Sequence, residues 1–239
     1  MNTNLKFIIT GTGRCGTVFA ARFLTSLGVP CGHESIFDYR NTGVKERILN
    51  PNKRFISECS TNDFIDGIRQ LLPEWVVPSE TQAESSYMAA PYLNMQEIAD
   101  VPLIHVYRNP IKVVSSFIFT LNYFSNTTPA DPWEVKIYET LPALYDIDTQ
   151  IERACYYYCK WNDLIENYSN SRPYLKINIE NINSDVFFDF VGLKPTGPLF
   201  DNKKVNQIIL DKTYLKLSDI PVGYIKDIFV EKVKSILMK

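Results

Sequence analysis

The stretch GTGRCGT, Gly11 to Thr17, lies between a short apolar run and an amphipathic segment. The run before it, Leu5 to Ile9, is almost continuously apolar, which is typical of a strand buried on both faces of a parallel sheet. The segment after it, Thr17 to Leu27, has apolar residues at helical spacing, and Gly28 then favours a helix end. We call residues 11–17 the glycine loop. The order strand, glycine loop, helix predicts a βα unit that binds phosphate.

A second unit of this kind lies further along the chain. Leu103 to Tyr107 (LIHVY) predicts a buried strand, and the segment Arg108 to Pro110 follows it. Proline favours the first turn of a helix. The next apolar residues have helical spacing, namely Val113, Val114, Phe117, Ile118 and Leu121. Two such units predict an α/β fold with a mainly parallel central sheet flanked by helices.

The rest of the chain contributes further predicted elements. The patterns indicate short strands at 54–59 and 81–86, a helix at 148–170, a strand at 174–179, a helix at 184–191 closed by Gly192, and a terminal helix at 224–238. Residues 122–148 mix prolines with aromatics and predict an insertion or lid. Its aromatics, from Tyr123 to Tyr145, would either stack on a sugar or phenol or form the lid's own core. We expect one domain over 1–239.

Composition argues against several classes of function. The chain has 239 residues, 45% of them hydrophobic, with a formal net charge of −2 and no dense Lys/Arg run, so we expect neither nucleic-acid nor membrane binding. No stretch approaches the roughly 20 apolar residues of a membrane span. The cysteines lack paired CxxC spacing, which argues against a disulfide framework and a structural zinc site (Cys15, Cys31, Cys59, Cys155, Cys159). We expect a cytoplasmic protein that needs no metal.

Two known classes of nucleotide site share the spacing of the glycine loop. The pattern G-x-G-x-x-G fits a Rossmann oxidoreductase that binds NAD(P) or a flavin, and Glu34 follows at about the 20-residue distance of its ribose-binding acid. The pattern G-x-x-x-x-G fits a nucleoside triphosphatase, which next needs Lys and Ser/Thr to hold a magnesium-bound triphosphate. Thr17 and Val18 stand there instead. ATP or GTP hydrolysis is therefore disfavoured, whereas the Rossmann alternative stays open.

Two motifs together resemble those of the sulfotransferases. Arg14-Cys15-Gly16-Thr17 resembles the 5′-phosphosulfate loop, where bacterial and carbohydrate-modifying members carry Arg-Ser-Gly-Thr. Arg108 and Ser116, within VYRNPIKVVSSF, resemble the family's 3′-phosphate site of an Arg after a strand and a Ser on the next helix. Weaker likenesses follow at 158–166, 174–182 and 187–193. The resemblance covers residues 6–193 and implies a P-loop α/β fold of three layers.

The resemblance also implies a reaction and a set of site residues. The donor is 3′-phosphoadenosine 5′-phosphosulfate, and the acceptor is a hydroxyl or amine of a small molecule or saccharide. Arg14 would stabilise charge on the leaving oxygen. The loop would hold the 5′-phosphate without metal, through Gly11, Thr12, Gly13, Arg14, Cys15, Gly16, Thr17 and Val18. Arg108 and Ser116 would hold the 3′-phosphate, since Ser116 lies off the apolar stripe of its helix.

Two residues are candidates for the base that removes the acceptor's proton. His33 and Glu34 follow a short connecting strand, at the sheet end where the glycine loop opens. Glu34 is the first candidate and His33 the alternative. Ser85 and Ser86 are expected either to line the acceptor pocket or to belong to a turn at the end of a strand.

Other polar residues have simpler explanations. His105 lies inside an apolar strand and is expected to be a hydrogen-bonded core residue, and Cys155 and Cys159 are expected to pack.

The chain also departs from the family pattern. Cys15 and Val18 replace a common Ser and Thr, which removes two hydroxyls from the loop. The Arg-Lys-Gly segment of cytosolic eukaryotic members is missing, and Lys203-Lys204 is the candidate substitute. A non-catalytic nucleotide-binding protein with a P-loop is therefore a third alternative.

Overall fold

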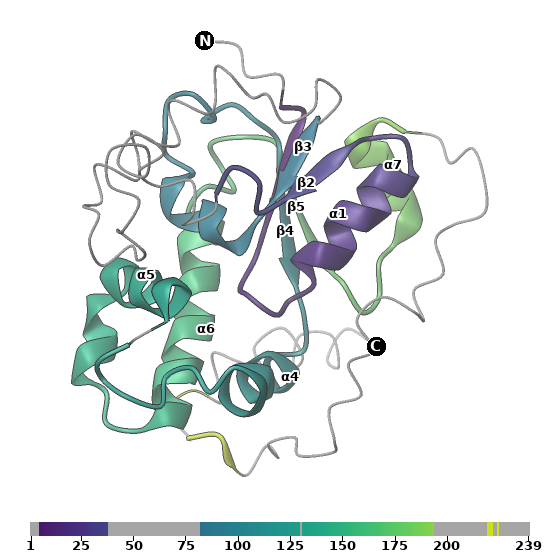
Figure 1. Ribbon diagram of the computed structural model, residues 1–239. Helices are drawn as coiled ribbons and strands as arrows, with labels where there is room; N and C mark the ends of the chain where they lie inside the picture. Colours follow the sequence, from purple (N-terminus) through teal and green to yellow (C-terminus); the bar gives the residue numbers. More distant parts are fainter. Residues whose placement is uncertain (1–4, 38–81, 130, 194–218, 222–223, 225–239) are drawn as a thin grey trace, which may run out of the picture.

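The computed structural model describes residues 5–37, 82–129, 131–193, 219–221 and 224. Its centre is a sheet in the order β2-β3-β1-β4-β5, in which every neighbouring pair is parallel (Figure 1). The strands are β1 (Phe7–Thr10), β2 (Cys31–His33), β3 (Ala83–Ser85), β4 (Leu103–Tyr107) and β5 (Tyr174–Asn178). The predicted α/β class with a parallel sheet is confirmed.

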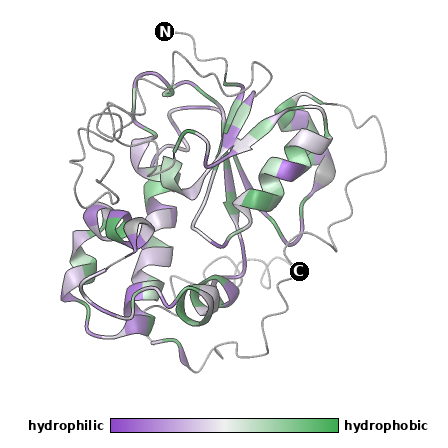
Figure 2. Ribbon diagram, viewed as in Figure 1, coloured by the Kyte–Doolittle hydropathy of each residue, from purple (hydrophilic) through white to green (hydrophobic). Residues whose placement is uncertain are grey.

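Helices cover both faces of this sheet (Figure 1). On one side lie α1 (Thr17–Ser26) and α7 (Ser184–Val191), where the rings of Phe23 and Phe187 are 5.2 Å apart. On the other lie α4 (Pro110–Ser115), α5 (Pro132–Thr140) and α6 (Gln150–Glu166). The shorter turns are the 3₁₀ helices η3 (Tyr87–Tyr92) and η5 (Pro142–Asp146) and the π-helix η4 (Ser116–Thr120). Helix α1, which packs against β1, β2 and β3, combines hydrophobic with hydrophilic residues, as a helix that covers a sheet does (Figure 2).

Several element boundaries differ from the prediction for local reasons. Strand β1 extends to Thr10 because Thr10 pairs with His105 of β4. Helix α6 begins at Gln150 because the Thr149 side chain accepts a hydrogen bond from the Glu152 N–H and caps the helix there. The helix after Pro110 changes from α to π at Ser116. The strand predicted at 54–59 and the helix at 224–238 lie outside the described residues, apart from Tyr224.

The strand order creates a crevice at the carboxyl edge of the sheet. The connection after β1 leads toward β2 on one side of β1, whereas the connection after β4 leads toward β5 on the other. In open α/β sheets a ligand site forms where neighbouring strands send their connections in opposite directions. The glycine loop follows β1 and Arg108 follows β4, so the two predicted anion-binding loops adjoin this crevice.

The core contains the groups that were expected to be structural. His105 is fully buried, and its ring nitrogens lie 2.7 Å from Tyr174 Oη and 2.8 Å from Asn162 Oδ1. Burial lowers the pKa of this imidazole to about 3, so it is neutral. Cys155 is buried and Cys159 packs against the core, as predicted for both. Across the described segments, no helix has both the length and the apolar character to span a membrane.

Candidate functional site

A pocket of about 340 Å³ opens at the carboxyl edge of the sheet. It falls within the usual size range of small-molecule sites, roughly 300–1,000 Å³. Its lining includes most of the predicted site residues, namely Gly13, Arg14, Gly16, Thr17, Val18, His33, Glu34, Arg108 and Ser116. Gly11, Thr12 and Cys15 are buried and do not line it. The pocket therefore brings together side chains that follow β1, β2 and β4.

The glycine loop has the backbone shape of an anion cradle. Arg14 and Gly16 both adopt left-handed backbone conformations, with φ of 65° and 106°. A side chain at Gly16 would be strained at this φ and would meet Ile179. Alternating right- and left-handed residues turn successive N–H groups toward one point, which makes a concave anion site. Among the described residues no side chain caps α1, so N–H groups of its first turn remain for a ligand.

Two backbone N–H groups of this loop already donate hydrogen bonds within the protein. The Gly13 N–H donates to Tyr157 Oη of α6 at 3.0 Å, and the Cys15 N–H donates to the Thr12 carbonyl at 3.3 Å. The Cys15 side chain is fully buried, and burial raises the pKa of its thiol to about 12. The Gly13 N–H thus already has a partner in Tyr157, although Gly13 itself lines the pocket, and its contact with a phosphate stays a prediction. The Cys15 side chain therefore belongs to the core and does not line the pocket.

Arg14 connects the two motifs directly. Its Nε donates to Ser116 Oγ of η4 at 2.8 Å, across 102 positions of sequence. Burial lowers the pKa of Arg14, and the charge of Arg108 lowers it further. Within the described ranges no carboxylate lies at ion-pair distance from Arg14. A half-buried guanidinium that faces a second guanidinium favours an anion between or beside them.

Arg108 has an acidic partner at the rim of the pocket. Its Nε lies 3.4 Å from Glu180 Oε1, and Lys112 Nζ lies 2.6 Å from the same oxygen. The Asn109 N–H donates to Glu180 Oε2 at 3.1 Å. Burial alone would raise the pKa of Glu180, but these hydrogen bonds and charges lower it overall. Glu180 thus fixes the loop after β4 while Arg108 still lines the pocket.

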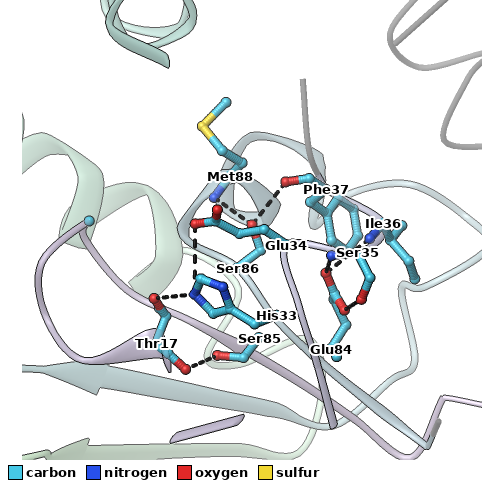
Figure 3. Close-up of polar contacts among 12 residues, drawn as sticks. Thr17, His33, Glu34, Ser35, Ile36, Phe37, Glu84, Ser85, Ser86 and Met88 are labelled. Carbon is cyan, nitrogen blue, oxygen red and sulfur yellow. Dashed lines mark hydrogen bonds and ion pairs between the residues drawn. The ribbon is translucent and has the colours of Figure 1, made fainter. Parts of the chain in front are cut away.

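The two candidate bases lie side by side (Figure 3), and both line the pocket. His33 Nε2 is 3.2 Å from Thr17 Oγ1 and 3.8 Å from Glu34 Oε1. The side chains of His33 and Glu34 are 28% and 20% exposed, so both are reachable from solvent. Glu34 adopts φ 52°, and its N–H donates to the Ser85 carbonyl at 3.1 Å. His33 thus contacts both the glycine loop and the carboxylate.

Left-handed backbone is concentrated around this pocket. In the part of the chain that is described, the non-glycine residues with positive φ are Arg14, Glu34, Asn122 and Phe124. Arg14 and Glu34 line the pocket, and the other two flank Tyr123, which also lines it. Such conformations are costly for side chains other than glycine and cluster at functional sites.

Ser85 and Ser86 do not line the pocket, so of the two explanations the turn at a strand end is the one that their contacts support. Both are fully buried. Ser85 Oγ donates to the Thr17 carbonyl at 2.8 Å, and Ser86 Oγ donates to the Phe37 carbonyl at 3.0 Å. The Met88 N–H in turn donates to Ser86 Oγ at 3.1 Å (Figure 3). These hydroxyls hold neighbouring loops in place.

An apolar wall completes the pocket, and the sequence indicated it only in part. Its residues are Tyr87, Phe117, Leu121, Tyr123 and Trp133. Tyr123 and Trp133 belong to the predicted insertion, whereas Phe124 and Tyr138 of the same segment are fully buried. Phe124 and Tyr138 thus form part of a core, whereas stacking of Tyr123 or Trp133 on a ligand stays a prediction. Phe117 had been assigned to a buried stripe, and Tyr87 gave no signal beyond its place just after a predicted strand.

A buried carboxyl group beneath the candidate bases predicts a pH-dependent stability. Burial raises the pKa of Glu84 to about 7, against hydrogen bonds from Ser35 and Ile36 that lower it. Because the folded pKa exceeds the unfolded one, the folded state binds the proton more tightly, and this stabilisation is lost as pH rises through about 7. Between about pH 4 and pH 8 the free energy of unfolding of the wild type should fall by about 3 kcal/mol relative to Glu84→Gln. Urea unfolding of both proteins across this range measures it, and parallel pH curves would contradict it.

The comparisons with known proteins give a likeness to solved structures and no match at the level of sequence families. No family model and no curated protein matches the sequence. Among solved structures, the chain is similar to the crystal structure of a sulfotransferase from Alicyclobacillus acidocaldarius, with 14% sequence identity and a TM-score of 0.44. The likeness covers 82% of this chain and 84% of that chain.

Proposed function

We propose that this protein is a sulfotransferase that transfers a sulfuryl group from 3′-phosphoadenosine 5′-phosphosulfate to a hydroxyl or amine of an acceptor. The observation that carries the proposal is the hydrogen bond from Arg14 Nε to Ser116 Oγ at 2.8 Å. It joins the loop that resembles a 5′-phosphosulfate site to the helix that resembles a 3′-phosphate site. One ribose carries both phosphates, so a single nucleotide requires the two motifs to share one pocket.

The charges in the pocket fit a donor with two anionic ends. Arg14 and Arg108 both line it, and Arg108 is close enough to lower the pKa of Arg14. The Arg14 end also offers the first turn of α1 and the Thr17 hydroxyl. Ser116, whose hydroxyl accepts from Arg14 Nε, lines the same pocket as Arg108. An anion at each end would relieve the repulsion between the two guanidinium groups.

The donor supplies a sulfuryl group whose bond to the 5′-phosphate oxygen breaks as the bond to the acceptor forms. Arg14 would stabilise the charge left on that oxygen. Glu34 would take the acceptor's proton, either directly or through His33, whose Nε2 lies 3.8 Å from the Glu34 carboxylate. Thr17 would hold the phosphate from the side facing His33.

The Rossmann alternative fits the strand order poorly. In that fold the second strand adjoins the first, so that an acidic residue at its end reaches the ribose of a nucleotide held after the first strand. Here β3 pairs with both β1 and β2 and lies between them. Glu34, just beyond β2, is therefore displaced from the ribose-binding position by one strand.

Replacement of Arg108 tests the assignment of the 3′-phosphate. Arg108→Ala should weaken binding of adenosine 3′,5′-bisphosphate by about 10- to 100-fold, because it removes a charge-assisted hydrogen bond to the 3′-phosphate. Affinity for adenosine 5′-phosphate should change far less. Lys112→Ala is the matched control, because Lys112 binds the same Glu180 but does not line the pocket. Isothermal calorimetry gives the affinities, and equal losses for both nucleotides would reject the assignment.

A panel of ligands tests the function as a whole. The protein is heated with adenosine 3′,5′-bisphosphate, with NAD(P), with FAD, and with ATP plus magnesium, and the melting temperatures are compared. A ligand at 100 times its dissociation constant adds about 2.7 kcal/mol to the unfolding free energy, a shift of several degrees. We expect the bisphosphate to give the largest shift, and labelled donor to yield a labelled acceptor. A shift with NAD(P) or FAD alone would overturn the proposal, and bisphosphate binding without transfer to any acceptor would favour a non-catalytic role.

A further inference from the structure

Glu84 is a fully buried carboxyl group that lies outside the pocket lining yet contacts the segment that carries the candidate bases. Its Oε1 accepts hydrogen bonds from the N–H groups of Ser35 and Ile36, at 2.7 and 3.0 Å. Its Oε2 lies 2.7 Å from Ser35 Oγ. Glu84 thus binds the two residues that directly follow Glu34 (Figure 3).

The neighbours of Glu84 on and after β3 reinforce this contact. The Ser85 carbonyl accepts the Glu34 N–H, and the Ser86 hydroxyl donates to the Phe37 carbonyl. The segment 34–37 is therefore held at each residue by the stretch 84–86. This matters at Glu34, whose φ of 52° is unfavourable for a non-glycine residue and persists only where the surroundings impose it.

The side chains of Glu84 and Ser35 are tightly packed against Gly32 of β2. A Cβ added at Gly32 would lie 2.0 Å from Ser35 Oγ and 2.5 Å from Glu84 Oε2. Glycine at this position lets β2 approach the Glu84–Ser35 pair closely. The Glu84 carboxylate thus lies close to Gly32 of β2 on one side and to Ser35 and Ile36 on the other.

We propose that Glu84 is a positioning residue, which holds residues 34–37 so that the Glu34 carboxylate faces the pocket beside His33. The proposal rests on the proposed function, in which Glu34 or the His33–Glu34 pair accepts the acceptor's proton. Glu84 acts through Glu34 and does not itself touch the reacting atoms, because it does not line the pocket.

The test compares Glu84→Gln with Glu84→Ala. Glutamine retains an oxygen for the two N–H groups and an amide for Ser35 Oγ, so Glu84→Gln should keep most of the turnover. Alanine releases the segment, and a misplacement of about 1 Å is enough to lower kcat by about 10²-fold. The affinity for adenosine 3′,5′-bisphosphate should stay within about twofold in both variants, since the contacts of Arg14 and Arg108 are unchanged.

A double-mutant cycle separates positioning from other roles. Because Glu84 acts through Glu34, Glu84→Ala should cause no further loss of kcat in a Glu34→Gln background. If Glu84→Ala does not fold, Ser35→Ala removes the hydroxyl that donates to Glu84 Oε2 while the two backbone hydrogen bonds to Oε1 remain, so it should show a smaller loss with the same non-additivity.

Three results would overturn the positioning role. These are a Glu84→Gln variant as inactive as Glu84→Ala, a loss that persists in the Glu34→Gln background, and full activity of Glu84→Ala. Failure of the wild type to bind the bisphosphate would instead refute the proposed function, so the two failures are distinguishable.

Discussion

Arg14→Ala is expected to lower turnover by about 10²- to 10³-fold, the size of effect seen when one preorganised group that stabilises transition-state charge is removed. Arg14 is the cation that lies in the glycine loop itself, and its Nε already points to Ser116 on the opposite motif. Folding stability should stay level or rise. Arg14 is half-buried beside Arg108, so its removal relieves desolvation and like-charge repulsion.

The control for this variant is Arg22→Ala on the same loop–helix unit. Arg22 is an exposed residue of α1 and does not line the pocket. Its replacement therefore removes the same positive charge at a position with no proposed role in catalysis. Steady-state kinetics and thermal unfolding of both variants make the comparison. An Arg14→Ala enzyme with wild-type turnover, or one that loses turnover only in proportion to its loss of folded protein, would contradict the assigned role.

Glu34→Gln is expected to lower kcat by about 10²- to 10⁴-fold, because general base catalysis contributes roughly this range. Glutamine preserves the shape of the side chain and its backbone contact with Ser85 while removing the proton acceptor. His33→Gln distinguishes the two candidates. If His33 only relays or orients, its replacement should have the smaller effect, since the carboxylate remains reachable from solvent.

The dependence of kcat on pH provides the second measurement for this pair. The fall of kcat at acidic pH reports protonation of the catalytic base. This fall should disappear in Glu34→Gln and remain in His33→Gln. If the fall is lost in His33→Gln and kept in Glu34→Gln, the base is His33 and our first assignment is wrong.

Much of the fold was predictable because local patterns carried it. The continuous apolar runs before the glycine loop and before Arg108 predicted β1 and β4, and helical spacing with Gly192 predicted α7, which ends at that residue. The boundary of α6 was not predicted, because the capping hydrogen bond of Thr149 is one of several equivalent choices in the sequence. Patterns of polarity locate an element better than they locate its ends.

The pocket was predictable in its polar half and largely not in its apolar half. Arg14 and Arg108 stood out because each follows a buried strand, but only the pairing of β1 with β4 brings the two loops together. Phe117 was expected on a buried stripe and is buried, but the sequence did not indicate that it also lines the pocket. Glu84 gave no sequence signal, since its partners Ser35 and Ile36 reach it only through the pairing of β2 with β3.

The most direct test of the central claim is calorimetric binding of adenosine 3′,5′-bisphosphate in the presence of EDTA, alongside the 5′- and 3′-monophosphates. If one pocket holds both phosphates through Arg14 and Arg108, the bisphosphate should bind once per chain without a divalent ion. Each monophosphate should bind at least about 10-fold more weakly, and each should be displaced by the bisphosphate. A bisphosphate that binds only with magnesium, or monophosphates that occupy separate sites without competing, would contradict the account.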